Sequence, residues 1–280
     1  MINKIGIIYF LYNLSEKTPI IIRKLIPNFI KKKYVKKILK FYFLHCKEKN
    51  LPSLNYVNEG NDEYQKNLIK KFIKTQKRHS FVTSPNLIQL LLTKFKNSDE
   101  FSFLDFGGEN IDFYLEINKN FKNVKYFLFN LDSINETFKR IKNKFNFNNL
   151  IVINNLEEIY NNRFTFVNFG SSIQYIDKYE EVLDKITDNS KFIYFSATHL
   201  YNSSNKIYSH KIVVKQVNDY PKIHYLYFFN DERFYEIFKK KNFQLIFEKN
   251  NPTDQVNYDN FKNELNNIRY CDFLFQKIQI

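Results

Sequence analysis

The sequence predicts an α/β protein: a Rossmann-like, doubly wound sheet that is mostly parallel, with an antiparallel C-terminal edge and an N-terminal helical segment before it. Two observations support this prediction. Strand-like and helix-like segments alternate from residue 101 onward, a pattern typical of a parallel sheet covered by helices. Three of the five glycines directly follow two strand-like segments, although average usage would give roughly twenty glycines in a chain of this length.

Helical patterns precede the alternation. Apolar residues recur at three- and four-residue steps between residues 28 and 47, with lysines on the opposite face, so we expect an amphipathic helix there. A second helix is expected near residues 62–77. A third should cover Asn86–Phe95, because Ser84 and Pro85 suit a helix N-cap and first turn.

The alternating region contains five strand-like segments with helices between them. The expected strands are Phe101–Phe106, Val124–Asn130, Leu150–Asn154, Phe164–Phe169 and Lys191–Ala197. The expected helices cover residues 110–120, 132–145, 156–160 and 177–188. Ser133 and Glu136 offer a capping box for the second of these helices.

The C-terminal part follows a different pattern. Three strands are expected here: Tyr225–Phe229, Phe243–Lys249 and Tyr270–Lys277. A helix capped by Asn230 should cover Asp231–Lys241. The last two strands have no convincing helix between them, so we expect an antiparallel pair at one sheet edge. Residues 198–222 are expected to form a long loop that covers a substrate.

Basic residues concentrate at the N-terminus. Residues 1–50 hold twelve of the 43 lysines and arginines but only two of the 29 acidic residues, so residues 51–280 carry a net charge of only +4. A nucleic-acid partner is therefore not indicated. We expect a basic amphipathic segment at 1–50 and a Rossmann-like domain at 51–280, with 51–98 as a helical lead-in. The lysine face suits either an anionic membrane surface or solvent.

Cysteine usage and the N-terminal apolar run bear on the cellular compartment. Cys46 and Cys271 are too few and too far apart for a disulfide framework or a zinc site, so we expect no metal and a reducing cytoplasm. The apolar run Ile5–Leu14 is too short to span a bilayer. It also lacks the small-residue cleavage site of a signal peptide.

The first strand of the alternating set ends in Asp105, Phe106, Gly107 and Gly108. In doubly wound sheets, ligands bind beyond the carboxyl ends of the strands where the strand order reverses. Glycines let the backbone approach a ligand, and a following helix offers free N–H groups. A carboxylate at this place suits a ligand with an amino group or a positive centre. The dinucleotide fingerprint G-x-G-x-x-G is absent, so the pattern favours S-adenosylmethionine over NAD. A simple turn capped by Asp105 is the alternative.

Four segments also carry a resemblance to a known family. They are Phe103-Leu-Asp-Phe-Gly-Gly108, Gly170-Ser-Ser-Ile-Gln-Tyr-Ile176, Val217-Asn-Asp-Tyr-Pro221 and Asp272-Phe-Leu-Phe-Gln-Lys277. On these segments, and over about residues 55–278, the chain resembles the class I S-adenosylmethionine-dependent methyltransferases. More narrowly, it is similar to a methyltransferase family associated with bacterial surface-polysaccharide loci.

The resemblance implies roles for the residues at the strand ends. The turn Asp105–Gly108 would surround the amino-acid end of the cofactor, and Asn130 would hold the ribose hydroxyls. Gly170 and Ser171 would lie under the methionine portion. The family commonly has a glycine where this chain has Glu109, and an acid where it has Asn130. A non-catalytic protein with the same fold is therefore the alternative.

Gln174, Tyr175 and His199 are the candidate catalytic residues. Gln174 and Tyr175 follow the fourth expected strand, where the family commonly places residues that face the methyl acceptor. A core aromatic is the alternative for Tyr175. His199 follows the fifth expected strand and suits a general base, although a surface histidine without a role fits the same pattern.

The sequence thus indicates an S-adenosylmethionine-dependent methyltransferase that is cytoplasmic or peripheral on the inner membrane face. Its acceptor would be a sugar or a surface-glycan precursor. The alternative is a non-catalytic module that binds a membrane or a partner, in either case through residues 1–50. An RNA methyltransferase fits least well, because the body of the chain is nearly neutral.

Overall fold

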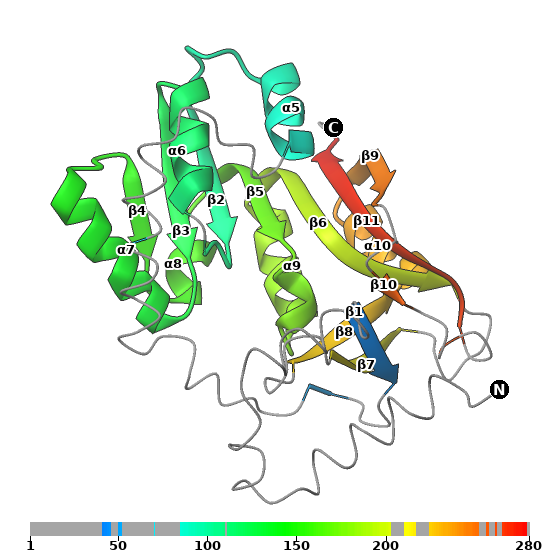
Figure 1. Cartoon of the computed structure of the whole chain (residues 1–280). Coiled ribbons are helices and arrows are strands. Elements are labelled where there is room, and N and C mark those ends of the chain that lie inside the picture. Colours follow the sequence, from blue (N-terminus) through cyan, green and yellow to red (C-terminus); the bar gives the residue numbers. More distant parts are fainter. Residues whose placement is uncertain are drawn as a thin grey trace, which may run out of the picture. The chain divides into compact units, whose positions relative to one another are not determined.

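Strands and helices alternate along the chain from Phe101 to Asn202 (Figure 1). The strands are β1 (Phe41–His45), β2 (Phe101–Phe106), β3 (Val124–Phe129), β4 (Leu150–Ile153), β5 (Phe164–Gly170), β6 (Ser190–Asn202), β7 (Lys211–Gln216), β8 (His224–Asn230), β9 (Phe243–Asn250), β10 (Val256–Asn257) and β11 (Asn266–Lys277). The helices are α5 (Pro85–Lys94), α6 (Ile111–Asn120), α7 (Asp132–Phe145), α8 (Leu156–Tyr160), α9 (Tyr179–Asp188) and α10 (Asp231–Lys240), with a 3₁₀ turn η1 (Ile173–Tyr175).

The computed structural model forms two compact units. It describes residues 41–45, 50–51, 70, 85–109, 111–202, 210–216, 224–251, 256–257, 261 and 265–278. The first unit comprises Met1–Pro52, His199–Phe234 and Asn250–Tyr270. The second comprises Ser53–Thr198, Tyr235–Lys249 and Cys271–Ile280. Among the described residues, no helix has the length and apolar character needed to cross a membrane.

The second unit contains a sheet with the strand order β9-β11-β6-β5-β2-β3-β4. The strands from β6 to β4 pair in parallel. Strand β11 runs the opposite way to β6: Asp272 in β11 bonds the Ala197 N–H in β6, whereas Lys277 at the end of β11 reaches Thr187, just before β6 begins. The prediction of a mostly parallel, doubly wound sheet with an antiparallel C-terminal edge is therefore confirmed.

Aromatic rings in register across the parallel strands form much of the core of this sheet. Phe103 on β2 pairs with Tyr126 on β3 and with Phe166 on β5, and Phe166 pairs with Phe192 on β6. The ring centroids in this row are 5.2, 5.5 and 6.0 Å apart. Cross-strand aromatic pairs stabilise a sheet, which explains how a chain with 31 phenylalanines forms buried parallel strands.

Local side-chain chemistry sets several helix ends. Asn146 ends α7 in a left-handed conformation with φ of 55°, which asparagine tolerates well. The Asn155 side chain caps α8 by accepting the Glu158 N–H at 2.9 Å. The capping box expected at Ser133 is wrong, because α7 begins at Asp132 and its N-cap residue makes no side-chain cap bond.

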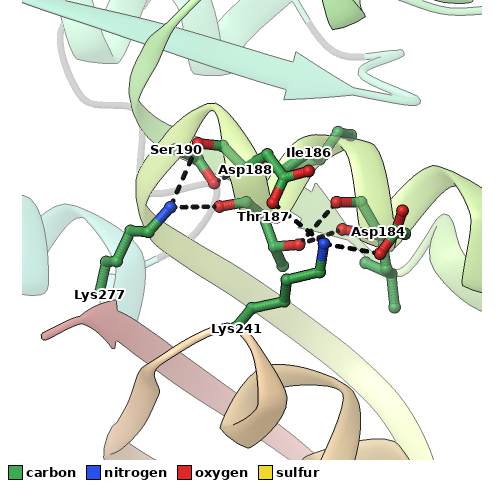
Figure 2. A network of polar contacts seen from close by, with 8 residues as sticks. Asp184, Ile186, Thr187, Asp188, Ser190, Lys241 and Lys277 are labelled. Atoms are coloured by element: carbon green, nitrogen blue, oxygen red, sulfur yellow. Dashed lines mark hydrogen bonds and ion pairs between the residues drawn. The ribbon is translucent and has the colours of Figure 1, made fainter.

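Two lysines bind the C-terminal part of α9 (Figure 2). Lys277 donates from Nζ to the carbonyl oxygens of Thr187 and Asp188 at 2.9 and 3.2 Å. Lys241 contacts Asp184 and Asp188 at 2.7 and 3.0 Å. The last carbonyls of a helix have no partner within the helix and carry partial negative charge, so Lys277 of β11 caps α9. The ion pairs of Lys241 connect the residue after α10 to the same helix.

The first unit contains a smaller sheet with the order β10-β1-β7-β8. Strand β7 pairs antiparallel with both β1 and β8, and β8 pairs in parallel with Leu200–Tyr201 of β6. This arrangement corrects the expected helix over 28–47 where the structure describes it. Residues 41–45 form a strand because Phe43–His45 pair with β7, about 170 positions later, and Phe41 and Tyr42 pair with β10. The rest of that expected helix lies outside the described residues.

The loop expected over residues 198–222 is also corrected. Residues 198–202 continue β6, and Lys211–Gln216 forms β7. Residue 70 is helical, in agreement with the expected helix near 62–77. The remainder of that helix and the segment Val217–Pro221 lie outside the described residues.

Candidate functional site

The candidate site lies at the carboxyl ends of β2 and β5 in the second unit. The chain continues from β2 to β3 and β4 on one side of the sheet, and β5 returns to pair with the other side of β2. The strand order therefore reverses between β2 and β5. Doubly wound sheets bind ligands at this edge, and both glycine turns predicted from the sequence lie there.

The turn after β2 is shaped by its two glycines. Gly107 has a φ of +78°, a conformation that side chains disfavour, and its N–H donates to the Phe129 carbonyl at 2.7 Å. A Cβ at Gly107 would lie 2.5 Å from the Cβ of Ser172. A Cβ at Gly108 would overlap the Asp105 carboxylate. Both glycines are therefore required by close packing within the protein.

Asp105 lies beneath this turn and is only 4% exposed. Its Oδ2 accepts the Tyr126 hydroxyl at 2.7 Å, and its Oδ1 accepts Nδ2 of Asn168 at 2.8 Å. Burial raises the pKa of Asp105 to about 6, against the lowering effect of these two hydrogen bonds. The carboxylate thus supports the turn from below, and Phe106 turns its ring into the core against Phe129 and Phe169.

The turn after β5 lies against the turn after β2. Gly170 also has a positive φ, +52°, and its N–H donates to Asn168 Oδ1 at 3.0 Å. Ser172 Oγ lies 2.9 Å from the Phe106 carbonyl oxygen, which fastens one turn to the other. Among the described residues, a Cβ at Gly170 would meet one atom within 4 Å, Ser196 Oγ at 4.0 Å. The backbone at Gly170 is therefore open, and Ser171 is exposed.

The end of β3 completes this edge of the sheet. Asn130 donates from Nδ2 to the Gly108 carbonyl at 2.9 Å, and its Oδ1 accepts the Leu131 N–H at 2.7 Å. Its amide therefore braces the turn after β2. Leu131 is 39% exposed and Asp132 is exposed beside it, so an apolar side chain and a carboxylate are accessible at this strand end. Glu109 is exposed as well.

The structure places two of the predicted catalytic residues beside the second turn. Gln174 and Tyr175 belong to η1, which starts three residues after Gly170. Gln174 is buried and Tyr175 is half-buried, so Tyr175 retains some accessible surface.

His199 lies in the first unit and is 3% exposed. Its ring stacks on Phe228 at 4.4 Å and lies near Phe43 and Tyr270 at 4.8 and 4.7 Å. Burial lowers its pKa to about 3. The expectation of a surface histidine is therefore wrong. An imidazole with this pKa is also a weak general base at neutral pH.

Four residues at this edge were not singled out from the sequence: Tyr126, Asn168, Ser172 and Ser196. Asn168 left the clearest signal, because it is an amide inside the otherwise apolar strand segment Phe166–Phe169, and buried parallel strands are usually continuously apolar. Tyr126 left no such signal, since a tyrosine in a core strand is ordinary. The described residues contain no cluster of histidine, cysteine or acidic side chains suited to a metal ion.

Comparisons with known proteins identify the fold. No protein-family model matches the chain, and no curated protein matches it. Among solved structures, 1,6-didemethyltoxoflavin-N1-methyltransferase from Burkholderia thailandensis, with 1,6-didemethyltoxoflavin and S-adenosylhomocysteine bound, superposes with a TM-score of 0.51 at 9% identity, over 85% of this chain and 95% of that one. The N-terminal domain of EvdMO1, crystallised in the presence of SAH and D-fucose, gives 0.50 at 11% identity, over 78% and 96%.

At sequence identities of 9% and 11%, the comparison with these two structures establishes the fold of the chain and nothing further. The chain has the fold of class I S-adenosylmethionine-dependent methyltransferases, in agreement with the sequence-based expectation.

Proposed function

We propose that this protein is an S-adenosylmethionine-dependent methyltransferase. The observation that carries the proposal is the pair of left-handed glycines, Gly107 and Gly170, at the ends of the two strands that flank the reversal of strand order. Doubly wound folds bind their ligands at that position, and glycine adopts this left-handed backbone without the steric penalty that a side chain would add.

The residues at this edge suit the parts of the cofactor. Gly170 leaves backbone open to a ligand, and the turn at Gly107 leads into α6, whose first N–H groups attract a carboxylate. Leu131 offers apolar surface for the adenine. Asp132 offers a carboxylate that can accept hydrogen bonds from the ribose, whereas the Asn130 amide is already bonded to Gly108 and Leu131. When bound, S-adenosylmethionine supplies an electrophilic methyl group on a sulfonium sulfur.

The protein's own contribution would be to position the acceptor. Transfer of a methyl group requires the accepting atom in line with the sulfonium, and holding that geometry lowers the barrier. Gln174 and Tyr175 after β5, and the Ser196 hydroxyl close to Gly170, are the polar groups proposed for this role. A general base is needed only when the acceptor carries a proton, and the pKa of about 3 at His199 argues against that residue.

For the acceptor we propose a small molecule, and within that class a sugar or surface-glycan precursor. The sequence resemblance to methyltransferases of polysaccharide loci supports this proposal, as does the presence of D-fucose with EvdMO1. The basic residues of segment 1–50 would hold the protein on the anionic inner membrane face, where such precursors are assembled.

Calorimetry with S-adenosylmethionine tests the proposal. The informative variant is Gly170→Asn, because asparagine tolerates a left-handed backbone while its side chain fills the space over the turn. We expect micromolar binding by the wild type, at least tenfold weaker binding by Gly170→Asn, and a nearly unchanged melting temperature. Lys96→Ala, an exposed change before β2, should bind like the wild type. Absence of binding by folded wild-type protein would reject the proposal.

A second candidate is a non-catalytic protein of the same fold. The observation that favours it is Asn130, whose amide is engaged by Gly108 and Leu131 where family members commonly have a ribose-binding acid. It predicts no cofactor binding but association with anionic liposomes through the basic N-terminal segment. The deletion that tests it should remove residues 1–40 only, because residues 41–45 form β1.

A further inference from the structure

A chain of hydrogen bonds crosses three neighbouring strands beneath the two glycine turns. Tyr126 on β3 donates its hydroxyl to Asp105 Oδ2, and Asn168 on β5 donates from Nδ2 to Asp105 Oδ1. The Oδ1 atom of Asn168 in turn accepts the Gly170 N–H. All three side chains are buried, so water competes little for the two bonds to Asp105 and the low dielectric strengthens them.

This series of hydrogen bonds connects the turn after β2 with the turn after β5. At one end the Asp105 carboxylate fills the position that a Cβ on Gly108 would take, so any movement of the carboxylate is transmitted to the turn after β2. At the other end Asn168 fixes the Gly170 N–H, where φ is +52°. Asn168 is the link between them, because its amide serves as a donor on one side and an acceptor on the other.

Few side chains can satisfy both neighbours of Asn168. The Asp105 carboxylate requires a donor and the Gly170 N–H requires an acceptor. An amide offers both, whereas a carboxylate offers acceptors only and an aliphatic chain offers neither. Loss of the Asn168 donor would leave a buried oxygen of the Asp105 carboxylate without this partner, and loss of the acceptor would release the Gly170 N–H.

We propose that Asn168 is a positioning residue that holds the turns after β2 and β5 at one fixed spacing for the cofactor. The inference rests on the proposed function and deepens it. Asn168 acts through Asp105 and Gly170, without touching the ligand itself. The role of Asp105 changes accordingly, from a ligand of the cofactor to a support beneath Gly108.

The sharpest test is Asn168→Asp, which keeps the shape and the acceptor for Gly170 but replaces the donor that faces Asp105. At pH 8 two carboxylates would then repel each other. Near pH 6 they can share one proton, which restores a hydrogen bond between them. In the part of the chain that the structure describes, the other titratable groups facing Asp105 are Tyr126 and, behind it, Tyr114. Burial raises the pKa of both phenols above their usual range, so neither titrates in this interval.

Two measurements are made at pH 8 and pH 6: calorimetry with S-adenosylhomocysteine, and hydrogen exchange of the amides at residues 107–109 and 170–172. At pH 8 we expect Asn168→Asp to bind at least tenfold more weakly than the wild type and to exchange faster at both turns. At pH 6 the variant should recover at least fivefold of that loss, while the wild type gains no affinity.

Two further variants make the result specific. Tyr114→Phe removes another partly buried hydrogen bond, the one to Asn149 Oδ1 at 2.7 Å, at the amino end of β4, and should change neither binding nor exchange at the turns by more than twofold. Asn168→Ala adds no carboxyl group, so it should loosen both turns at both pH values. It also replaces Asn168→Asp if that variant fails to fold at pH 8.

The outcomes separate the inference from the proposed function. Faster exchange at both turns, reversed at pH 6 in Asn168→Asp alone, supports the positioning role. Unchanged exchange at either turn would overturn it, as would equal loss in Tyr114→Phe. If the wild type binds neither S-adenosylmethionine nor S-adenosylhomocysteine, the proposed function is rejected. The hydrogen-exchange data still decide whether Asn168 holds the two turns.

Discussion

Gly107 and Gly170 share a left-handed backbone but differ in their surroundings. A Cβ at Gly107 would press on the Cβ of Ser172 at 2.5 Å, whereas a Cβ at Gly170 would meet, within the described part of the chain, only Ser196 Oγ at 4.0 Å. The first glycine is thus required by packing between two turns, and the second leaves room for a ligand. The sequence shows both as scarce residues after strands and cannot distinguish these roles, because Ser172 comes next to Gly107 only through the pairing of β2 with β5.

A double-mutant cycle tests this distinction. Gly107→Ala should lower the free energy of unfolding by about 2–5 kcal/mol, since about 1–2 kcal/mol for a left-handed residue adds to about 1–3 kcal/mol for overpacking. In a Ser172→Gly background the same change should cost only about 1–2 kcal/mol, the backbone part alone. Urea denaturation measures both values. An equal cost in the two backgrounds would show that contact with Ser172 does not constrain Gly107.

At the scale of elements, sequence patterns predicted the strands and helices of the second unit well, because burial repeats locally. Helix α7 has the predicted bounds, 132–145, although the capping box expected at Ser133 is absent. Strand β1 was not predicted, because the residue pattern of Phe41–His45 fits the apolar face of a helix as well as it fits a strand. Its pairing with β7, far along the chain, makes this segment a strand, and the local sequence contains no signal for such a long-range pairing.

The C-terminal end of α9 provides a prediction at this scale. Lys277→Met should lower the free energy of unfolding by about 1–2 kcal/mol, because it removes a charged donor from two helix-terminal carbonyls. Lys240→Met removes an exposed ion pair with Glu236 and should cost less than about 1 kcal/mol. Thermal unfolding compares the two variants. Lys277 acts before β6, at the end of the sheet opposite the glycine turns, so weaker S-adenosylhomocysteine binding in Lys277→Met would contradict this assignment.

At the scale of the whole molecule, the order of the strands in the sheet could not be predicted from the sequence. Alternation predicts that the strands are parallel, but only the pairing of β2 with both β3 and β5 places the reversal between the two glycine turns. The same holds for Asp105. The sequence places it at a strand end, and its burial and raised pKa depend on Tyr126 and Asn168 from the neighbouring strands.

The two units should respond to pH in opposite directions. Burial raises the pKa of Asp105 in the second unit from 3.8 to about 6. The folded state therefore holds this proton more tightly, and the stabilisation present below pH 3.8 is lost as the pH rises through 6. Burial lowers the pKa of His199 in the first unit from 6.5 to about 3. The stability that the neutral His199 side chain contributes to the folded state is fully present above pH 6.5 and is lost as the pH falls toward 3.

Hydrogen exchange at pH 6.5 and pH 5, corrected for intrinsic rates, tests this difference. Each group contributes about 1.4 kcal/mol per pH unit between its folded and unfolded pKa values. Protection around Phe228 in β8 should therefore fall by about 2 kcal/mol on acidification, while protection around Phe103 in β2 should rise by about 1 kcal/mol. His199→Phe keeps an aromatic ring against Phe228 and should abolish the first change only. If both units lost protection together, or if the loss near Phe228 persisted in His199→Phe, another group would have to be responsible for the acid sensitivity.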